Sequence, residues 1–435
     1  MRKNLIKQGE EHLKYEIREI VEIGKQIEKR GIEKMIWENI GDPVAKGERI
    51  PTWMKEIVKD ACDHDRTYAY APTKWDLAAR EFILDHYSDR RVCTVEDIIF
   101  FNWLGEAINK IFANLSPHVR VIGPNPTYPS HATAEAMHHD GEPITYSLDI
   151  MESGRIDLEE LESKVRYNEN IAGILVINPN NPTGVVHPRE DLIEVVRIAR
   201  EYGCFLIFDE IYQNIVFDRS TITRLSDIVG DVPAISMKGI SKEIPWPGAR
   251  CGWIEVYNAD KDENFRSYIH SILVSKMLEV CSTTLPQVIF PSIVKSPNYD
   301  SFFHSRIEKY RRRRDEALEI FSRTKYLKPL SPEGVFYLTV PFSEVTDSMR
   351  TKPLESKTKE IRLYLDAIEA PDMRRDKRFA YELMGSEWVC VVPLSGFYSP
   401  VDGFRMTLLE EDDAIFRETC ERIVRGVEGF FERNI

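Results

Sequence analysis

The stretch ISMKGISKEIPWPGARCGWIEVY, residues 235–257, joins two apolar runs through a tight turn. The first run leads to Ser241 and Lys242, a Pro/Gly turn follows at 245–248, and Arg250 precedes the second run. A lysine at a strand end can lie in a dry pocket, where burial favours the neutral amine that reacts with carbonyl groups. An arginine that returns to the same pocket can bind a phosphate with its planar fork. Taken alone, the pattern also fits an ordinary surface lysine in a proline-rich loop.

Two upstream strand ends carry polar residues as well. NPNNPTG at 178–184 follows the apolar run 173–177, and FDEIY at 208–212 closes the apolar run 204–208. Strands are predicted at 172–177, 204–208, 234–237 and 252–257, with a helix at 189–202. This alternation favours an α/β fold with a mostly parallel sheet covered by helices, and it places the polar loops at the carboxyl ends of the strands.

The three motifs together resemble the class I/II, fold-type I aminotransferases that use pyridoxal 5′-phosphate. They stand in the order of that family, with 28 residues from Asn181 to Asp209 and 33 from Asp209 to Lys242. The pattern is closest to bacterial alanine aminotransferases and covers nearly the whole chain, from Tyr15 to Arg405. The resemblance implies a large domain with a mostly parallel seven-stranded sheet sandwiched by helices, and a smaller α+β domain.

The resemblance also implies domain boundaries. Residues 1–60 would contribute an N-terminal segment to the small domain. Residues 61–320 would form the large cofactor-binding domain, and 321–435 the C-terminal small domain. Within the small domain, residues 344–374 are predicted to be an insertion.

The roles around the cofactor ring follow from the resemblance residue by residue. Lys242 would hold pyridoxal phosphate as a Schiff base and then act as the base, while Asp209 would keep the ring nitrogen protonated. Tyr212 would donate to the ring oxygen, with Asn181 as the second donor. Tyr128 would stack on the ring. His131 would support Asp209.

The phosphate contacts are predicted at a strand-to-helix turn, where free backbone N–H groups bind anions. Leu104 and Gly105 would supply those N–H groups. Ser241 and Arg250, from the segment after Lys242's strand, would also contact the cofactor. Trp103, Leu104 and Gly105 stand where the family is richer in Gly, Ser and Thr, and Gly239 stands where many relatives have serine. These departures predict fewer hydroxyl contacts to the phosphate. Across a homodimer interface, Tyr70 would reach the partner's phosphate, and Tyr68 is the alternative.

The substrate contacts fall in three separate parts of the chain. Gly41, Asn181 and Arg405 would hold the α-carboxylate, and only a residue without Cβ lets a ligand approach the backbone so closely. Tyr15 and Arg18 belong to an amphipathic helical pattern near the N-terminus and would approach the substrate from there.

The overall composition of the chain argues against some classes of binding partner. The chain has 435 residues with 58 basic and 71 acidic side chains, a net charge of −13, which argues against nucleic acid or an anionic membrane as the partner. The basic run at 311–314 lies in a mixed-charge helical stretch and is interpreted as a solvated face. Seven scattered cysteines without a CxxC pair predict a reducing cytoplasm and no metal site. No run approaches membrane-spanning length.

These observations predict a transaminase that moves the amino group of an L-amino acid, alanine-like or aspartate, to a 2-oxo acid such as 2-oxoglutarate in a ping-pong reaction. The same residues serve C–S or β-lyases, decarboxylases and aminocyclopropane-carboxylate synthases on this fold. A cofactor-binding regulator fused to a DNA-binding domain is a further alternative. Residues 1–60 are too few for such a domain.

Overall fold

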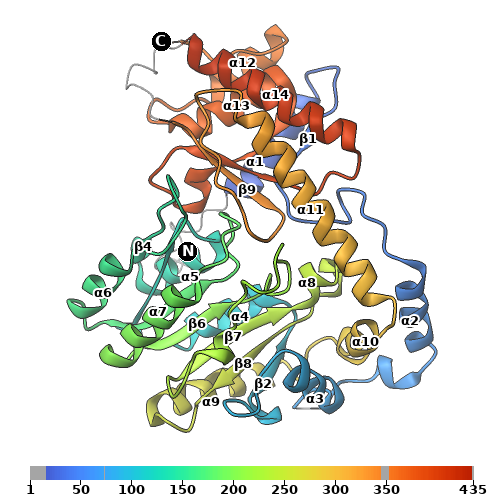
Figure 1. The fold of residues 1–435 in the computed structure, drawn as a ribbon, viewed down its shortest axis with the longest axis vertical. Helices are drawn as coiled ribbons and strands as arrows, with labels where there is room; N and C mark the ends of the chain where they lie inside the picture. Colours follow the sequence, from blue (N-terminus) through green and yellow to red (C-terminus); the bar gives the residue numbers. More distant parts are fainter. Residues whose placement is uncertain (1–15, 73, 344–351, 434–435) are drawn as a thin grey trace, which may run out of the picture.

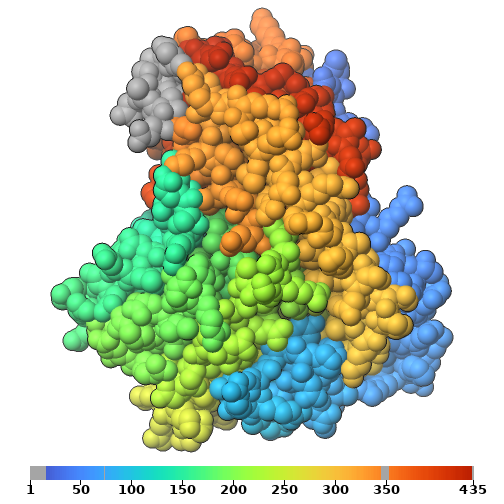
Figure 2. All heavy atoms as spheres, in the orientation of Figure 1, coloured from blue at the N-terminus to red at the C-terminus, as the bar shows by residue number. Residues whose placement is uncertain are grey.

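The computed structural model describes residues 16–72, 74–343 and 352–433. Figure 1 shows a broad sheet surrounded by helices, with a smaller group of strands and helices above it. Helix α11 (Tyr299–Phe321) runs along one side from the first part to the second. Figure 2 shows the same golden-orange segment on the surface between the red C-terminal helix and the blue segments below.

The central sheet has seven strands in the order β2-β8-β7-β6-β5-β3-β4. The strands are β2 (Ile98–Phe101), β3 (Arg120–Asn125), β4 (Thr145–Ser147), β5 (Ile171–Ile177), β6 (Phe205–Asp209), β7 (Ala234–Gly239) and β8 (Gly252–Tyr257). Only β8 runs antiparallel to its neighbours. Strands β2, β7 and β8 are buried along their whole length, as expected when helices cover both faces. The predicted mostly parallel seven-stranded sheet is confirmed.

Nine helices of the described chain accompany this sheet. They are α2 (Thr52–Cys62), α3 (Leu77–His86), α4 (Leu104–Ala113), α5 (Pro129–His139), α6 (Leu158–Arg166), α7 (Arg189–Tyr202), α8 (Ile240–Glu243), α9 (Glu263–Met277) and α10 (Thr284–Val294). Helix α7 has the predicted bounds. It buries Leu192, Val195 and Val196 on one face, and it ends because Gly203 adopts a left-handed conformation at φ 68°.

The smaller part contains two short sheets. Strands β9 (Tyr337–Pro341), β12 (Gly403–Thr407) and β11 (Val392–Pro393) pair antiparallel, and β1 (Ile36–Trp37) pairs parallel with β10 (Val389–Cys390). The helices here are α1 (Glu16–Glu28), α12 (Lys359–Ile368), α13 (Arg375–Glu387) and α14 (Asp413–Glu432). The β1–β10 pair joins an N-terminal segment to this part. The domain boundaries given above stay a prediction.

Three local features add to the predictions from the sequence. Val95–Asp97 form a 3₁₀ turn capped by Thr94, and β2 begins directly after it at Ile98. Within the predicted insertion, α12 buries Ile361 and Leu365, and residues 344–351 lie outside the described chain. The basic run is not wholly a solvated face, because Arg313 is fully buried and pairs with Asp413.

Among the helices of residues 16–72, 74–343 and 352–433, none has both the length and the apolar character of a membrane span.

Candidate active site

A cavity of about 650 Å³ opens at the carboxyl edge of the central sheet. Most of the predicted site residues line it, namely Arg18, Gly41, Leu104, Gly105, Tyr128, Asn181, Asp209, Tyr212, Ser241, Lys242, Arg250 and Arg405. They come from segments far apart in the sequence. The cavity therefore gathers the motifs that the sequence analysis singled out.

The topology explains why these residues meet. Strands β5, β6 and β7 are parallel neighbours, so the loops after them emerge at one edge. Asn181 lies in the loop after β5, Asp209 is the last residue of β6, and Lys242 lies in α8 directly after β7. Arg250 stands just before β8, which runs antiparallel and so starts at that same edge.

Lys242 is held at the cavity by a contact from the N-terminal segment. Its Nζ donates to the carbonyl oxygen of Gly41 at 2.6 Å, and it lies 5.8 Å from the ring centroid of Phe336. A Cβ on Gly41 would lie 1.9 Å from the hydroxyl of Tyr337. Glycine is therefore the residue that fits this turn.

Asp209 is buried, with 4% of its surface exposed. Its Oδ2 lies 2.9 Å from Nε2 of His131, and its Oδ1 accepts from the backbone N–H of Ile211 at 3.2 Å. His131 is equally buried and approaches Asp209 from outside the cavity lining. This placement fits the support of Asp209 that was predicted for His131.

Tyr212 forms a buried pair with a residue that the sequence analysis did not name as a site residue. Its hydroxyl donates to the hydroxyl of Tyr337 at 3.2 Å. Burial and the neighbouring Tyr337 raise the pKa of Tyr212 well above its usual value. Burial opposes ionisation of Tyr337 too, but the positive charges of Lys242 and Arg405 and the bond from Tyr212 outweigh it and lower the pKa of Tyr337. Tyr212 is therefore the harder of the two hydroxyls to ionise.

Arg405 is fixed on β12 by contacts on every side. Its guanidinium donates to Oδ1 of Asn181 at 3.1 Å and to the carbonyl oxygen of Asn39. It lies 4.0 Å from the ring centroid of Tyr337 and 4.7 Å from that of Phe397. A guanidinium held in this orientation can bind a carboxylate by donating two parallel hydrogen bonds.

Asn39 is a second site residue that the sequence analysis missed. It lines the cavity and is fully buried, yet its side-chain amide has no hydrogen-bond partner in the part of the chain that the structure describes. An unsatisfied buried amide costs free energy, so the arrangement favours a polar ligand beside it. The only sequence signal was its position two residues before Gly41.

Arg250 and the start of α4 form a candidate anion seat. Arg250 Nη1 donates to the carbonyl oxygen of Pro247 at 2.8 Å, and its guanidinium lies 4.4 Å from the ring centroid of Trp103. Burial lowers the pKa of Arg250. The first N–H groups of α4, at Leu104 and Gly105, have no carbonyl partner within the helix. A cation and free N–H groups at a helix N-terminus suit a phosphate.

Trp103 shapes this seat. It stands at the N-terminal cap of α4 with φ 124°, a conformation that a tryptophan rarely adopts. Its indole covers Gly105 so closely that a Cβ there would lie 2.4 Å from the ring. Trp103 therefore explains why Gly105 takes the place of a hydroxyl-bearing residue.

The two candidates for the contact across a dimer interface stand apart from the lining. Tyr70 and Tyr68 are 81% and 75% exposed and do not line the cavity. Tyr15 lies outside the described residues. Arg18, on α1, is exposed but does line the cavity.

Comparison with known proteins gives consistent matches. The chain matches the model of the family Aminotransferase class I and II over residues 33–423. It is 44% identical over 436 residues to an uncharacterized aminotransferase from Methanocaldococcus jannaschii, which covers 99% of this chain and 100% of that protein. It is 29% identical over 333 residues to the glutamate-pyruvate aminotransferase AlaA of Escherichia coli, covering 75% of this chain and 80% of AlaA. A solved alanine aminotransferase from Pyrococcus furiosus aligns with a TM-score of 0.83 at 25% identity, covering 98% and 100% of the two chains.

Proposed function

The chain belongs to the class I and II aminotransferases, and within that family we propose that it moves the amino group of a small L-amino acid, alanine first, to 2-oxoglutarate. The observation that carries the proposal is the shared cavity of Lys242, Asp209 and Arg405. It offers an amine, a buried carboxylate and a buried cation to one ligand. Such a set suits an amino acid bound beside a nitrogen heterocycle.

The family implies pyridoxal 5′-phosphate as the cofactor, and the residues present fit it. Arg250 and the N–H groups at the start of α4 would hold the phosphate, with the hydroxyl of Ser241 beside them. Tyr128 would cover the ring and Asp209 would face its nitrogen. When bound, pyridoxal phosphate supplies a conjugated ring that withdraws electrons from the substrate Cα.

The side chains then have distinct tasks. Lys242 would hold the cofactor covalently through Nζ and, once displaced by the substrate amine, take the proton from the substrate Cα. Tyr212, which keeps its proton, can donate a hydrogen bond to an oxygen of the ring. Arg405, with Asn181 and the backbone of Gly41, would bind the substrate α-carboxylate and so orient the Cα–H bond toward Lys242.

The substrate class is supported by the relatives and by α1. AlaA is a glutamate-pyruvate aminotransferase, and the solved Pyrococcus furiosus protein is an alanine aminotransferase. Arg18 is the third arginine of the cavity lining, besides Arg250 and Arg405. Because Arg250 is assigned to the phosphate, Arg18 and Arg405 would let a dicarboxylic acid such as glutamate or 2-oxoglutarate bind with both carboxylates.

A donor panel tests the proposal. The purified protein with pyridoxal phosphate is incubated with single L-amino acids and 2-oxoglutarate, and the new 2-oxo acid, glutamate and ammonia are measured. Alanine should give pyruvate and glutamate in equal amounts without ammonia. Pyruvate and ammonia formed from serine or cysteine, without glutamate, would instead identify a lyase that eliminates the β substituent. Turnover with aspartate or tyrosine and none with alanine would overturn the assigned donor.

We also propose that two copies form a homodimer with sites at the interface. Tyr68 and Tyr70 are exposed and do not line their own cavity. Thr284 Oγ1 donates to the carbonyl oxygen of Ala69, between the two tyrosines, and so connects this segment to the start of α10. Thr283 in turn donates to Asn102, next to Trp103. The exposed tyrosines therefore flank the anion seat, where a second copy could use them. The cytoplasmic location remains a prediction from the cysteine pattern.

A further inference from the structure

Side chains of helix α11 form hydrogen bonds with α8, the short helix that carries Lys242. The hydroxyl of Tyr299, at the start of α11, donates to the carboxylate of Glu243 at 2.6 Å. Two turns later, Arg306 donates through Nη1 to the carbonyl oxygen of Glu243 at 2.6 Å and through Nη2 to that of Lys242 at 3.2 Å. The backbone of Lys242 therefore rests on a side chain from outside the cavity lining.

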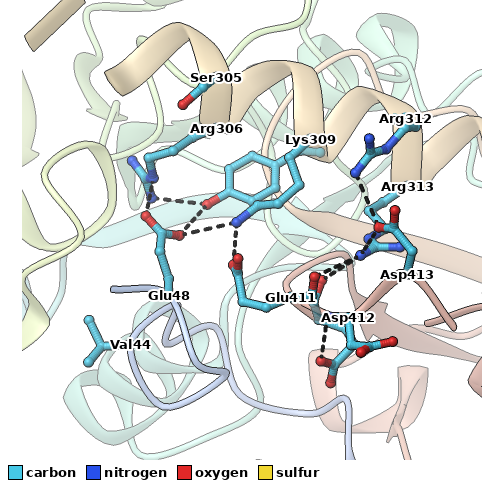
Figure 3. Close-up of polar contacts among 12 residues, drawn as sticks. Val44, Glu48, Ser305, Arg306, Lys309, Arg312, Arg313, Glu411, Asp412 and Asp413 are labelled. Atoms are coloured by element: carbon cyan, nitrogen blue, oxygen red, sulfur yellow. Dashed lines mark hydrogen bonds and ion pairs between the residues drawn. The ribbon is translucent and has the colours of Figure 1, made fainter. Parts of the chain in front are cut away.

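Arg306 is itself held by Glu48. Its Nε lies 2.5 Å from Oε1 of Glu48, and both side chains are buried, at 3% and 6% exposure. Tyr310 completes the cluster, because its hydroxyl accepts from Arg306 at 3.0 Å and donates to Glu48 Oε2 at 3.2 Å. Figure 3 shows Glu48 pointing at Arg306 and Lys309 from the N-terminal segment below α11. A buried ion pair of this kind is costly to break from one side only.

The segment from Gly41 to Glu48 thus meets Lys242 at both ends. Its first residue accepts from the lysine Nζ at 2.6 Å, and its last residue holds the guanidinium that binds the lysine carbonyl. The backbone N–H of Glu48 donates to the carbonyl of Pro43 at 2.9 Å, which keeps the segment folded. These contacts form a closed ring through the backbone and the side chain of Lys242.

We propose that Arg306 and Glu48 are a positioning pair that sets the distance between the Nζ of Lys242 and the substrate-binding backbone at Gly41. The inference rests on the proposed function of Lys242. Neither residue lines the cavity, so neither touches the substrate or the cofactor. Arg306 acts on the backbone of Lys242, and Glu48 acts as part of the 41–48 segment that carries Gly41.

Arg313 provides a matched control on the same helix. It is fully buried like Arg306, and it binds the carbonyl of Glu410 at 3.0 Å and the carboxylate of Asp413 at 2.6 Å. Its contacts in the described chain are with residues of α11, of α14 and of the turn before α14, and not with Lys242 or the 41–48 segment. Figure 3 shows it further along the helix, directed at Asp413. Arg313→Lys therefore reports what a buried arginine on α11 contributes to stability alone.

The test compares Arg306→Lys, Glu48→Gln, the double variant and Arg313→Lys, each loaded with pyridoxal phosphate. We measure kcat and KM, the melting temperature, and the pH midpoint of the visible absorbance that borohydride abolishes. Arg306→Lys keeps the charge but loses the fork, so kcat should fall about ten- to a hundredfold and the spectral midpoint should move by about half a unit or more. Arg313→Lys should lower the melting temperature and leave both the midpoint and kcat near the wild-type values.

The double variant separates a shared role from two independent ones. If the pair acts as one unit, Glu48→Gln should add little to the loss in kcat that Arg306→Lys already causes. The inference is overturned if Arg306→Lys changes only the melting temperature, as Arg313→Lys does. A wild-type protein without any borohydride-sensitive band would instead refute the proposed function of Lys242.

Discussion

The Nζ of Lys242 lies 2.6 Å from the carbonyl oxygen of Gly41, although 201 positions separate the two residues. Gly41 belongs to the N-terminal segment, whereas Lys242 follows a strand of the central sheet. The contact shows that the smaller part and the sheet build one site together. Lys242 therefore has two properties that can be tested separately. It donates a hydrogen bond to the Gly41 carbonyl, and it carries an amine that can form an imine.

Two substitutions of Lys242 separate these properties. Lys242→Ala removes both, and Lys242→Arg keeps a cation for the Gly41 carbonyl but cannot form an imine. Both variants should lose the borohydride-sensitive absorbance, and kcat should fall by about 10²–10⁴-fold because the base at the substrate Cα is gone. Absorbance and a steady-state assay at saturating cofactor check this. Near-normal turnover of Lys242→Arg would refute the covalent role.

The anion seat makes a prediction about an added hydroxyl. Gly105→Ser would offer a phosphate donor, but its Cβ would lie 2.4 Å from the Trp103 ring. We expect a cost of about 1–3 kcal/mol from this overpacking, or roughly a 5- to 150-fold increase in the dissociation constant of pyridoxal phosphate.

Removing the indole should reverse that loss. Trp103→Gly also suits the positive φ at this position, so the double variant Trp103→Gly/Gly105→Ser should bind the cofactor more tightly than Gly105→Ser. Quenching of intrinsic fluorescence during titration of the apo-protein measures both constants. Equal affinity of Gly105→Ser and the wild type would show that the indole moves aside without cost.

His187 predicts a loss of stability in acid. Its ring is fully buried, neither ring nitrogen has a hydrogen-bond partner in the described chain, and burial lowers its pKa from 6.5 to about 4. The unfolded chain therefore binds this proton at a higher pH than the folded chain does. The resulting loss in the free energy of unfolding is negligible above pH 6.5. It grows as the pH falls toward 4, where it reaches about 3 kcal/mol.

Urea unfolding at several pH values checks this prediction. His187→Asn cannot take up the proton, so between pH 6.5 and 4 its free energy of unfolding should fall less steeply than that of the wild type. The same exchange at the exposed His118 should leave the slope unchanged. Parallel curves for the wild type and His187→Asn would contradict the assignment to this ring.

The layout of the sheet was predictable because its signals are local. The apolar runs of β5, β6 and β7 are short and end in Asn-, Asp- and Lys-bearing loops, and the parallel arrangement brings such loops to one edge. Helix α7 was predictable for the same reason, because its apolar stripe and the glycine that ends it are neighbours in the sequence. The motifs that carry the fold therefore also placed Asn181, Asp209 and Lys242 around one cavity.

The residues that were missed depend on contacts between distant segments. Tyr337 was not predicted as a site residue, and its role beside Tyr212 appears only because β9 brings it to the loop that follows β6. Asn39 and Glu48 lie in a turn whose partners are more than 200 positions away. Arg313 was assigned to a solvated face because the basic run lies in a mixed-charge helical stretch, and only its packing against α14 shows that it is buried. Such pairings carry no periodicity that a single sequence could reveal.

The proposed dimer predicts that two inactive variants restore each other. Tyr70 is 81% exposed and does not line the cavity of its own chain, so its hydroxyl would serve the partner's phosphate. Tyr70→Phe should weaken cofactor binding by about 1.5–3 kcal/mol, the usual cost of one hydrogen bond to a charged group. In a mixed dimer with Lys242→Ala, one site carries both defects and the other carries neither.

Refolding an equal mixture of the two variants should therefore recover about a quarter of the wild-type activity, measured at a cofactor concentration too low to load Tyr70→Phe alone. Each variant refolded by itself supplies the baseline, and Tyr68→Phe mixed in the same way shows which tyrosine crosses the interface. Because intact sites arise only when the two chains exchange side chains, activity no higher than the mean of the two baselines for both tyrosines would show that each cavity is complete within one chain.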